Sequence, residues 1–319
     1  MLKFSRIPVL IFSVVIFLFP WIAQSVPAIS HYTDILVFAG LYCLITIGLS
    51  LLMGYAGQIS LGHAAFFGLG AYFSGVLTTR YGWNPWMVMV AGTLFTSIIA
   101  GAVGWPALKL KGHYLAMATL AFGIIVVIIF NEEIEITGGP DGLTRIPGLK
   151  IMGFAFNTVE RYYYLVWTLV LAIFLFTANL IQSGIGRALR ALHSSESAAM
   201  AMGVDAAKYK LLVFIYSGAL ASLAGSLYAH YLKFINPSTF NIFFGIKLLI
   251  MIALGGMNFL WGSIIGAIII SFLSYEWLQY FEELEILVYG GILLVFTVFA
   301  PGGLAAIPHM ILEKVRTRK

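Results

Sequence analysis

Long apolar runs, separated by short polar connections, follow one another through most of the chain. A run of about 20 apolar residues is long enough to cross the hydrocarbon core of a bilayer as a helix. The pattern predicts an all-α, polytopic transmembrane bundle within a single domain, residues 1–319, with about ten spans at 7–24, 34–53, 62–79, 86–108, 114–131, 162–181, 211–232, 243–260, 262–280 and 286–300. The third and ninth spans have the weakest signal, because they are rich in glycine and follow their predecessors closely.

Composition supports a membrane protein. Of the 319 residues, 61% are hydrophobic and only 10% are charged. A soluble domain carries roughly 25% charged residues on average. The composition therefore argues against a soluble globular domain.

The basic residues are divided unequally between the two sides that the spans define. If the N-terminus is cytoplasmic, Arg80, Arg145, Lys150, Arg161 and Lys233 lie outside. The cytoplasmic side then holds the larger set: Lys3, Arg6, Lys109, Lys111, Arg187, Arg190, Lys208, Lys210, Lys314, Arg316, Arg318 and Lys319. This asymmetry follows the positive-inside rule and predicts that both termini are cytoplasmic. Because the charges are spread over separate loops, the net charge of +5 does not indicate nucleic-acid binding.

The N-terminal run allows two interpretations. Lys3 and Arg6, followed by apolar residues and the small residues near 23–25, resemble a cleavable signal peptide. We favour a retained first span, because a chain with nine further spans needs no cleaved leader. The single cysteine, Cys43, excludes an intramolecular disulfide.

Charged side chains are scarce inside the predicted spans. Lys247 and Glu276 are the charged residues well inside them, and each lies near a span end. This pattern does not indicate a proton or sodium relay. The chain also has no GxxxxGK[ST] phosphate loop, and its histidines lack metal-ligand spacing, so we expect no catalytic residue and no metal site.

The segment GYAGQISLGHAAFFGLGAY, residues 54–72, combines flexibility with polar side chains. Its glycines permit bends, and the pairs Ala64/Gly68 and Ala71/Gly75 have the small-xxx-small spacing of closely packed helices. Its polar side chains need partners wherever water is absent. Two interpretations stay open, a translocation path or helix packing alone, for Gly54, Tyr55, Gly57, Gln58, Ser60, His63 and Gly68.

Two further segments have helical patterns that predict a contact. Ser217, Ala221, Gly225 and Ala229 place small residues on one face of the seventh span, which predicts close packing against another helix. The polar segment 182–210 contains a short helix, capped by Ser194 or Ser195 and stopped by Gly203. Such a short helix is marginal alone in water, and it is either a solvated loop helix or a docking element.

Several motifs together resemble one family. GYAGQISLGHAAFFGLGAY, KLKGHYLAMATLAFG, ITGGPDGLTRIPG, ESAAMAMG, LGGMNFLWGSIIGA and FAPGGL are similar to motifs of the LivM-type permeases of branched-chain amino acid ABC importers, more than to those of the LivH type. The resemblance covers about residues 34–304. ESAAMAMG resembles the EAA-type coupling loop of such permeases.

The resemblance implies a permease in the bacterial inner membrane, surrounded by lipid and binding no cofactor itself. Its implied partners are a second, LivH-like permease, two ABC ATPase subunits that use ATP, and an extracytoplasmic solute-binding protein. It implies an ATPase contact at Glu196, Ala199 and Gly203 in loop 182–210. It places outside the cell the loop of Thr137, Gly138, Gly139, Pro140, Asp141 and Gly142.

One departure from the family pattern leaves the substrate open. Family members often carry Glu and Arg in the segment corresponding to FGIIVVIIF, where this chain has Ile124 and Val127. Hydrophobic amino acids, urea and small organic acids all remain candidate substrates. An ion-coupled secondary transporter is the alternative from a different class, and a membrane scaffold is a more distant one.

Overall fold

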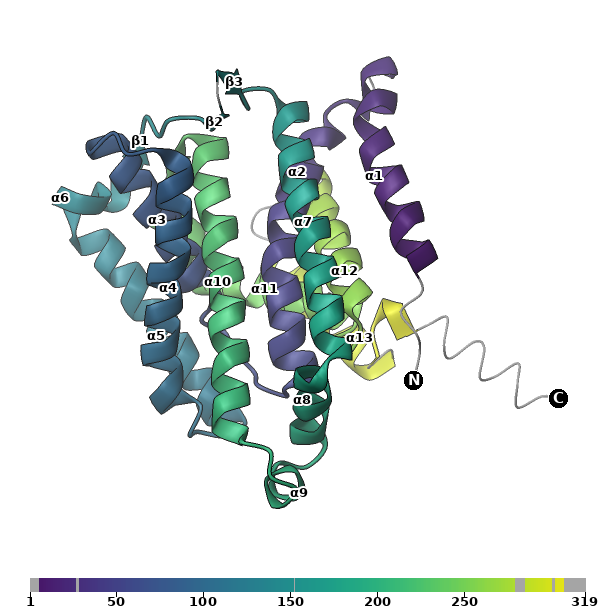
Figure 1. Cartoon of the computed structure of the whole chain (residues 1–319). Coiled ribbons are helices and arrows are strands. Elements are labelled where there is room, and N and C mark those ends of the chain that lie inside the picture. Colours follow the sequence, from purple (N-terminus) through teal and green to yellow (C-terminus); the bar gives the residue numbers. More distant parts are fainter. Residues whose placement is uncertain (1–5, 27–28, 152, 279–284, 300–301, 307–319) are drawn as a thin grey trace.

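The computed structural model describes residues 6–26, 29–151, 153–278, 285–299 and 302–306, and it has a helix at each of the ten predicted spans (Figure 1). These helices are α1 (Arg6–Ser25), α2 (Tyr32–Leu49), α3 (His63–Arg80), α4 (Pro85–Ala107), α5 (His113–Glu132), α7 (Val159–Gln182), α10 (Ala206–Leu232), α11 (Ile242–Gly255), α12 (Leu260–Phe272) and α13 (Glu285–Phe299). The all-helical architecture of the bundle is thereby confirmed.

Shorter elements connect and extend these helices. Two π-helical turns, η2 (Ser50–Tyr55) and η5 (Leu273–Trp277), continue α2 and α12. The other short elements are α6 (Ile134–Thr137), α8 (Gly184–Ser194), α9 (Glu196–Ala201), the 3-10 turns η3 (Gly139–Asp141), η4 (Pro237–Phe240) and η8 (Leu304–Ala306), and the strands β1 (Leu143–Thr144), β2 (Lys150–Ile151), β3 (Phe154–Ala155) and β4 (Phe234–Ile235). β1 pairs with β4 and β2 with β3, both antiparallel.

The helices differ in length and in hydropathy, the two properties that decide whether a helix can cross a bilayer by itself. Among the described residues, seven helices are long and apolar enough to cross a membrane, and α11 and part of α13 are shorter apolar helices. The 18-residue α3 has the length of a span, but glycines and polar side chains reduce its hydropathy. It is accommodated because the protein itself surrounds it: most of its residues, from His63 to Thr78, are buried.

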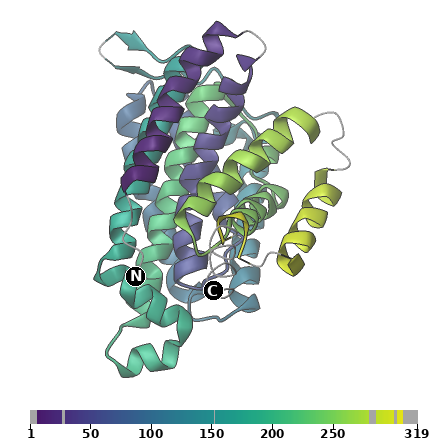
Figure 2. The ribbon, with the colours of Figure 1, turned by 90° about the vertical axis from the view of Figure 1, so that its right-hand side faces the viewer.

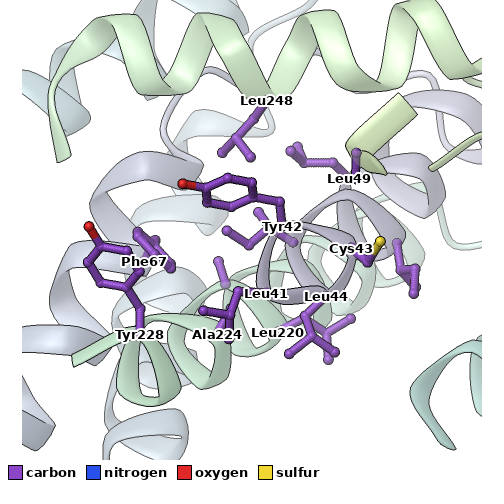
Figure 3. Close-up of a cluster of buried hydrophobic side chains, with 14 of the residues drawn as sticks. Leu41, Tyr42, Cys43, Leu44, Leu49, Phe67, Leu220, Ala224, Tyr228 and Leu248 are labelled. Atoms are coloured by element: carbon purple, nitrogen blue, oxygen red, sulfur yellow. The ribbon is translucent and has the colours of Figure 1, made fainter. Parts of the chain in front are cut away.

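α2 lies at the centre of the bundle. Every residue from 37 to 54 is buried, and α7, α10, α11 and α12 all pack close to it or to its continuation η2. Figure 3 shows side chains of α2, α10 and α11 meeting in this core. By contrast, α1 leaves Ile7, Leu10 and Ile11 more than half exposed, as expected of a helix that faces lipid.

The closest helix crossing joins α3 to α10. A Cβ on Gly225 would lie 1.9 Å from the Phe67 carbonyl oxygen, and a Cβ on Gly70 would lie 2.1 Å from the Ser222 carbonyl oxygen. Only glycine allows backbones to approach so closely. The predicted close packing of the small-residue face of α10 is confirmed, since Ser217, Ala221 and Ala229 are also fully buried.

The two ends of the bundle are built differently. α8 and α9 project from one end, whereas α6 and the short strands gather at the other (Figures 1 and 2). Lys111 and Lys210, both predicted to be cytoplasmic, contact Glu196 of α9 at the first end. Lys150 and Lys233 are predicted to lie outside; at the second end, Lys150 begins β2, and Lys233 caps α10 immediately before β4.

Candidate functional site

The segment 54–72 begins with a break in the central helix. α2 loosens into the π-helical turn η2, the chain runs without regular structure through residues 57–62, and α3 starts at His63. Gly57 has φ = 65°, a left-handed conformation that glycine adopts without cost. π-turns inside helices often mark functional positions, because they displace the following residues from the regular ladder.

Gly54, in η2 before the break, lies against the turn between α11 and α12. A Cβ on this residue would lie 1.8 Å from the carbonyl oxygen of Met257, in the turn between α11 and α12. The Ser50 hydroxyl donates to the same carbonyl at 3.1 Å. Two motifs that lie about 200 residues apart in the sequence, GYAGQ and LGGMNF, therefore meet backbone to backbone.

A chain of polar contacts fixes the start of α3. His63 Nδ1 lies 3.0 Å from the Ser60 hydroxyl, and His63 Nε2 lies 2.7 Å from the Ser217 hydroxyl of α10. The backbone N–H of Leu61 donates to Thr119 of α5 at 3.0 Å. Ser60 and His63 are buried, so these bonds satisfy groups that have no access to water. For these two residues the geometry favours helix packing over exposure to a path.

Gly68 occupies a different environment from the one its spacing predicts. A Cβ there would meet the ring of Phe130 at 2.8 Å and that of Phe240 at 3.0 Å, not the backbone of a facing helix. The close approach expected at Gly68 instead occurs at Gly70, which the small-xxx-small pairs did not include. Periodicity identified a small-residue helix but could not tell which of its faces meets α10.

The first half of the segment lies against loop 182–210. A Cβ on Gly57 would lie 3.4 Å from Nδ1 of His193, on α8. The side chain of Gln58 is 9% exposed and donates through Nε2 to the Ala56 carbonyl at 3.2 Å, which stabilises the turn. Tyr55, on the same turn, is partly buried. The break in α2 is thus in contact with the loop.

Local capping explains the fold of this loop. Ser195, in extended conformation, accepts a hydrogen bond from the Ala198 N–H and starts α9. Gly203 follows the helix with φ = 84°, the left-handed conformation typical of a helix end. The Asp205 carboxylate then accepts from the Lys208 N–H and starts α10. The predicted short helix is confirmed, with Ser195 as its cap.

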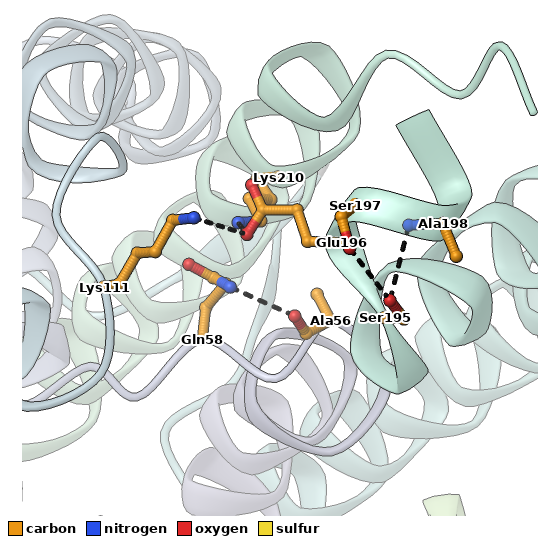
Figure 4. A network of polar contacts seen from close by, with 8 residues as sticks. All are labelled: Ala56, Gln58, Lys111, Ser195, Glu196, Ser197, Ala198 and Lys210. Atoms are coloured by element: carbon orange, nitrogen blue, oxygen red, sulfur yellow. Dashed lines mark hydrogen bonds and ion pairs between the residues drawn. The ribbon is translucent and has the colours of Figure 1, made fainter. Parts of the chain in front are cut away.

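Glu196 joins α9 to two other parts of the chain. Its carboxylate lies 2.9 Å from the Lys210 ammonium and 3.8 Å from that of Lys111 (Figure 4). Hydrogen bonding to Lys210, with the charges of both lysines, holds the pKa of the Glu196 carboxyl below its usual value against the opposing effect of burial. Because Lys111 lies between α4 and α5, one carboxylate connects α9, α10 and the start of α5.

α9 has a buried side, which packs on its own chain, and an exposed side. Ala199 is 4% exposed and packs with Leu192 and Ala206 in a small apolar cluster. Met200 and Met202 are 49% and 85% exposed. A partner that docks on α9 therefore meets the methionines, whereas Ala199 anchors the helix to its own chain. Alternating burial of this kind cannot be deduced from six residues without their neighbours.

The loop 137–142 forms a tight turn at the opposite end of the bundle (Figure 1). The Thr137 hydroxyl donates to the carbonyls of Phe130 and Glu133 and accepts from the Gly139 N–H. Gly138, Gly139 and Gly142 all have positive φ, and a Cβ on Gly142 would lie 2.2 Å from the Ile235 carbonyl of β4. Pro140 and Asp141 are exposed at its tip.

Comparisons with known proteins decide the family. The family described as branched-chain amino acid transport system / permease component matches residues 31–297. The chain is 31% identical to the high-affinity branched-chain amino acid transport system permease protein LivM of Escherichia coli, over 85% of this chain and 69% of that protein. The chain belongs to this permease family. It is a LivM-type, multi-pass inner-membrane protein and a transport subunit rather than an enzyme.

Other relatives of the permease are more distant. The LivH permease protein of Salmonella typhimurium is 25% identical, over 72% of this chain and 79% of that protein. The BraD permease protein of Pseudomonas aeruginosa is 24% identical, over 91% of this chain and its full length. No solved structure matches the chain significantly.

A second histidine bond in the permease mirrors the first. His230 of α10 lies 2.8 Å from the Ser74 hydroxyl of α3, and its Nδ1 lies 2.7 Å from the Pro147 carbonyl. His63 joins α3 to Ser217 nearer the α8–α9 end. Each helix of the crossing thus gives one histidine to the other, an arrangement that the scattered histidines of the sequence did not reveal. Among the described residues, no three His, Cys, Asp or Glu side chains group as metal ligands.

Proposed function

We propose that this permease is one of two membrane subunits of an ATP-driven importer for branched-chain amino acids in a bacterial inner membrane. A LivH-like permease is its membrane partner, two ABC ATPases bind on the α8–α9 side, and a solute-binding protein delivers substrate at the opposite end. ATP is bound and hydrolysed by the ATPases, and this chain binds no cofactor. Its proposed topology has about ten crossings, with both termini on the α8–α9 side.

The observation that carries this proposal is the connection between α9 and the broken central helix. α9 presents Met200 and Met202 outward, while Glu196 connects it to α10. α8, on the other side of α9, lies against Gly57 in the break after η2. A force on α9 is therefore passed to both α10 and α2, the two helices that pack most deeply in the bundle.

The proposed ATPase contact has a division of roles. Met200, Met202 and the open side of Gly203 form the docking surface, since no atom of the described part of the chain lies within 4 Å of where a Gly203 Cβ would be. Glu196 and Ala199 hold α9 in place rather than touching the partner. An exposed methionine pair beside a helix end fits an apolar cleft, because unbranched thioethers adapt to its shape.

Uptake by the purified importer tests the function. The permease, co-expressed with its partner subunits, is reconstituted into liposomes, with ATP inside and binding protein plus labelled leucine outside. We expect uptake to require ATP and to be inhibited by isoleucine and valine but not by urea or a small organic acid. Uptake that follows a proton or sodium gradient in liposomes of this chain alone would support a secondary transporter instead.

A further inference from the structure

A cavity of about 580 Å³ lies between α1 and α7. This volume is within the range of roughly 300–1,000 Å³ typical of small-molecule sites. Its lining comes from one face of each helix: Val9, Leu10 and Ser13 of α1, and Leu175, Ala178, Asn179 and Gln182 of α7. Leu10 and Leu175 are exposed, so the cavity lies at the outer surface of the described bundle. α8 begins two residues after Gln182, which places the cavity at the α8–α9 end.

Contacts outside the cavity join α1 to α7. The Tyr163 hydroxyl donates to the Ile16 carbonyl at 2.9 Å, and the rings of Phe12 and Trp167 pack edge to face with their centres 5.9 Å apart. Both contacts use the first half of α7, whereas its part of the cavity begins about two turns further on, at Leu175. The two helices are thus held together towards one end, and the cavity separates them towards the other.

Two side-chain amides make one end of this cavity polar. Asn179 and Gln182 are exposed on the last turn of α7, and neither side chain forms a hydrogen bond within the described part of the chain. α7 has 24 residues, which makes it about 36 Å long, more than the roughly 30 Å of the hydrocarbon core. Its last turn therefore reaches the level of lipid headgroups, where oxygen atoms can accept from these amides.

Arg187 adds a positive charge beside the same turn. Its Nη1 donates to the Gln182 carbonyl at 3.3 Å, which brings the guanidinium to the carbonyl end of α7. The side chain is exposed, and a guanidinium has five N–H donors, so donors remain for an anion. The cavity thus extends from apolar walls to a polar end beside a positive charge.

We propose that this cavity binds an anionic phospholipid of the leaflet at the α8–α9 end, with its phosphate on Arg187 and an acyl chain between α1 and α7. The amides of Asn179 and Gln182 donate to phosphate or ester oxygens of the same lipid. Leu10 and Leu175 cover the beginning of the acyl chain. This inference does not depend on which solute is transported, because it uses only the position of the chain in a membrane.

The charge of the site determines which lipid it prefers. A guanidinium attracts every phosphate, but a zwitterionic headgroup also carries a cation, which Arg187 repels. A lipid with a net negative charge, such as phosphatidylglycerol, has no such opposing charge. One basic residue near a membrane surface favours an anionic lipid about fivefold. Selectivity of this size is the measurable signature of the site.

Photolabelling with two lipids tests the proposal. The permease, reconstituted with its partner subunits, is irradiated with phosphatidylglycerol or phosphatidylcholine that carries a diazirine near the ester group, and labelled peptides are identified by mass spectrometry. Residues 98–105 of α4 are the reference, because Ile98 and Trp105 are exposed and Lys109 follows nearby. Relative to this reference, phosphatidylglycerol should label residues 9–13 and 175–182 about fivefold more than phosphatidylcholine does.

Matched variants test the role of the charge. Arg187→Gln should lose the preference for phosphatidylglycerol, whereas Arg187→Lys, which keeps the charge without the planar fork, should retain part of it. Lys208→Gln, which removes an exposed charge at the same end, should match the wild type. In detergent, phosphatidylglycerol should raise the wild-type Tm by about 2–5 °C more than phosphatidylcholine does, and Arg187→Gln should abolish this difference.

Three outcomes would overturn the proposal. They are equal labelling of the cavity by both lipids, a preference for phosphatidylglycerol that survives in Arg187→Gln, and a protein occupant. Leu10→benzoylphenylalanine, irradiated in the same liposomes, detects the last, because it should crosslink to lipid and not to the second permease or to another segment of this chain. Leucine uptake enters none of these measurements, so they stay decisive even if the proposed function fails.

Discussion

The Glu196 carboxylate lies 2.9 Å from the Lys210 ammonium, which joins the first residue of α9 to the early part of α10. Lys210 is 5% exposed, so this carboxylate replaces the water that its charge would otherwise require. The two residues lie on either side of the Gly203 turn. Their ion pair therefore ties α9 to α10, so that the two helices are expected to move together.

Acid should release α9 in the wild-type permease. The pKa of Glu196 is lowered in the folded state, chiefly by its hydrogen bond to Lys210. The contribution of the pair to stability is therefore complete above the ordinary carboxyl pKa and is lost as the pH falls through the lowered folded value. A nitroxide on Ser197→Cys, in a Cys43→Ser background, should become more mobile below about pH 4.

A substitution at the same residue supplies the control. Glu196→Gln should give a mobile label at every pH and cost about 1–3 kcal/mol of local stability. Glu135→Gln, at the exposed far end of the bundle, should behave as the wild type. If the label responds to acid equally in Glu196→Gln, then Glu196 is not the group that holds α9.

Gly203 allows docking to be blocked without touching the membrane helices. Its φ of 84° strains any larger residue, by about 1–2 kcal/mol, but its Cβ direction is open. Gly203→Trp should therefore insert normally and lose co-purification with the ATPases, whereas Gly203→Ala, which has the same strain without the bulk, should keep it. If both variants lose co-purification equally, the loss is caused by strain in the turn and not by a blocked docking surface.

The α3–α10 crossing should be intolerant of a single methyl group. In Gly225→Ala the new Cβ would clash with the Phe67 carbonyl at 1.9 Å, and backbone cannot yield as a side chain does. We expect the free energy of unfolding in detergent to fall by about 1–3 kcal/mol or more. Gly290→Ala, with no atom of the described residues within 4 Å of its Cβ position, should be neutral or slightly stabilising in the same thermal assay.

Cysteines at the two ends of the bundle test the topology. Asp141→Cys and Ser194→Cys, each in the Cys43→Ser background, place exposed thiols at opposite ends. In sealed right-side-out vesicles, an impermeant maleimide should label only the thiol at 141. Labelling of both positions in intact vesicles would contradict the proposed orientation of loop 182–210.

The sequence predicted the helices well, because a membrane-spanning helix can be recognised from the apolar residues of its own segment. It also predicted the α9 turn, since Ser195 and Gly203 act through their own backbone neighbours. It could not show that Gly70 rather than Gly68 meets α10, because both lie on a helix with small residues on several sides. The choice depends on how α3 is rotated in the bundle.

The surroundings of Lys247, in a cavity of about 350 Å³ that tyrosine rings line, were beyond sequence reasoning for a different reason. Tyr42, Lys247, Tyr275 and Tyr289 come from α2, α11, η5 and α13, and no spacing in the chain relates them. Lys247 considered alone resembles a lysine that reaches the membrane surface. Its inward position depends on the tyrosines that three other elements bring to it.

The ratio of leucine imported to ATP hydrolysed, measured in the same reconstituted liposomes, tests the central claim that α9 couples the two processes. The wild-type importer should show uptake that stops without ATP and hydrolysis that the loaded binding protein stimulates. Glu196→Gln, which keeps the docking methionines but frees α9 from α10, should hydrolyse ATP while importing at least several-fold less leucine per ATP. An unchanged ratio in Glu196→Gln, or uptake that continues without ATP, would contradict the account.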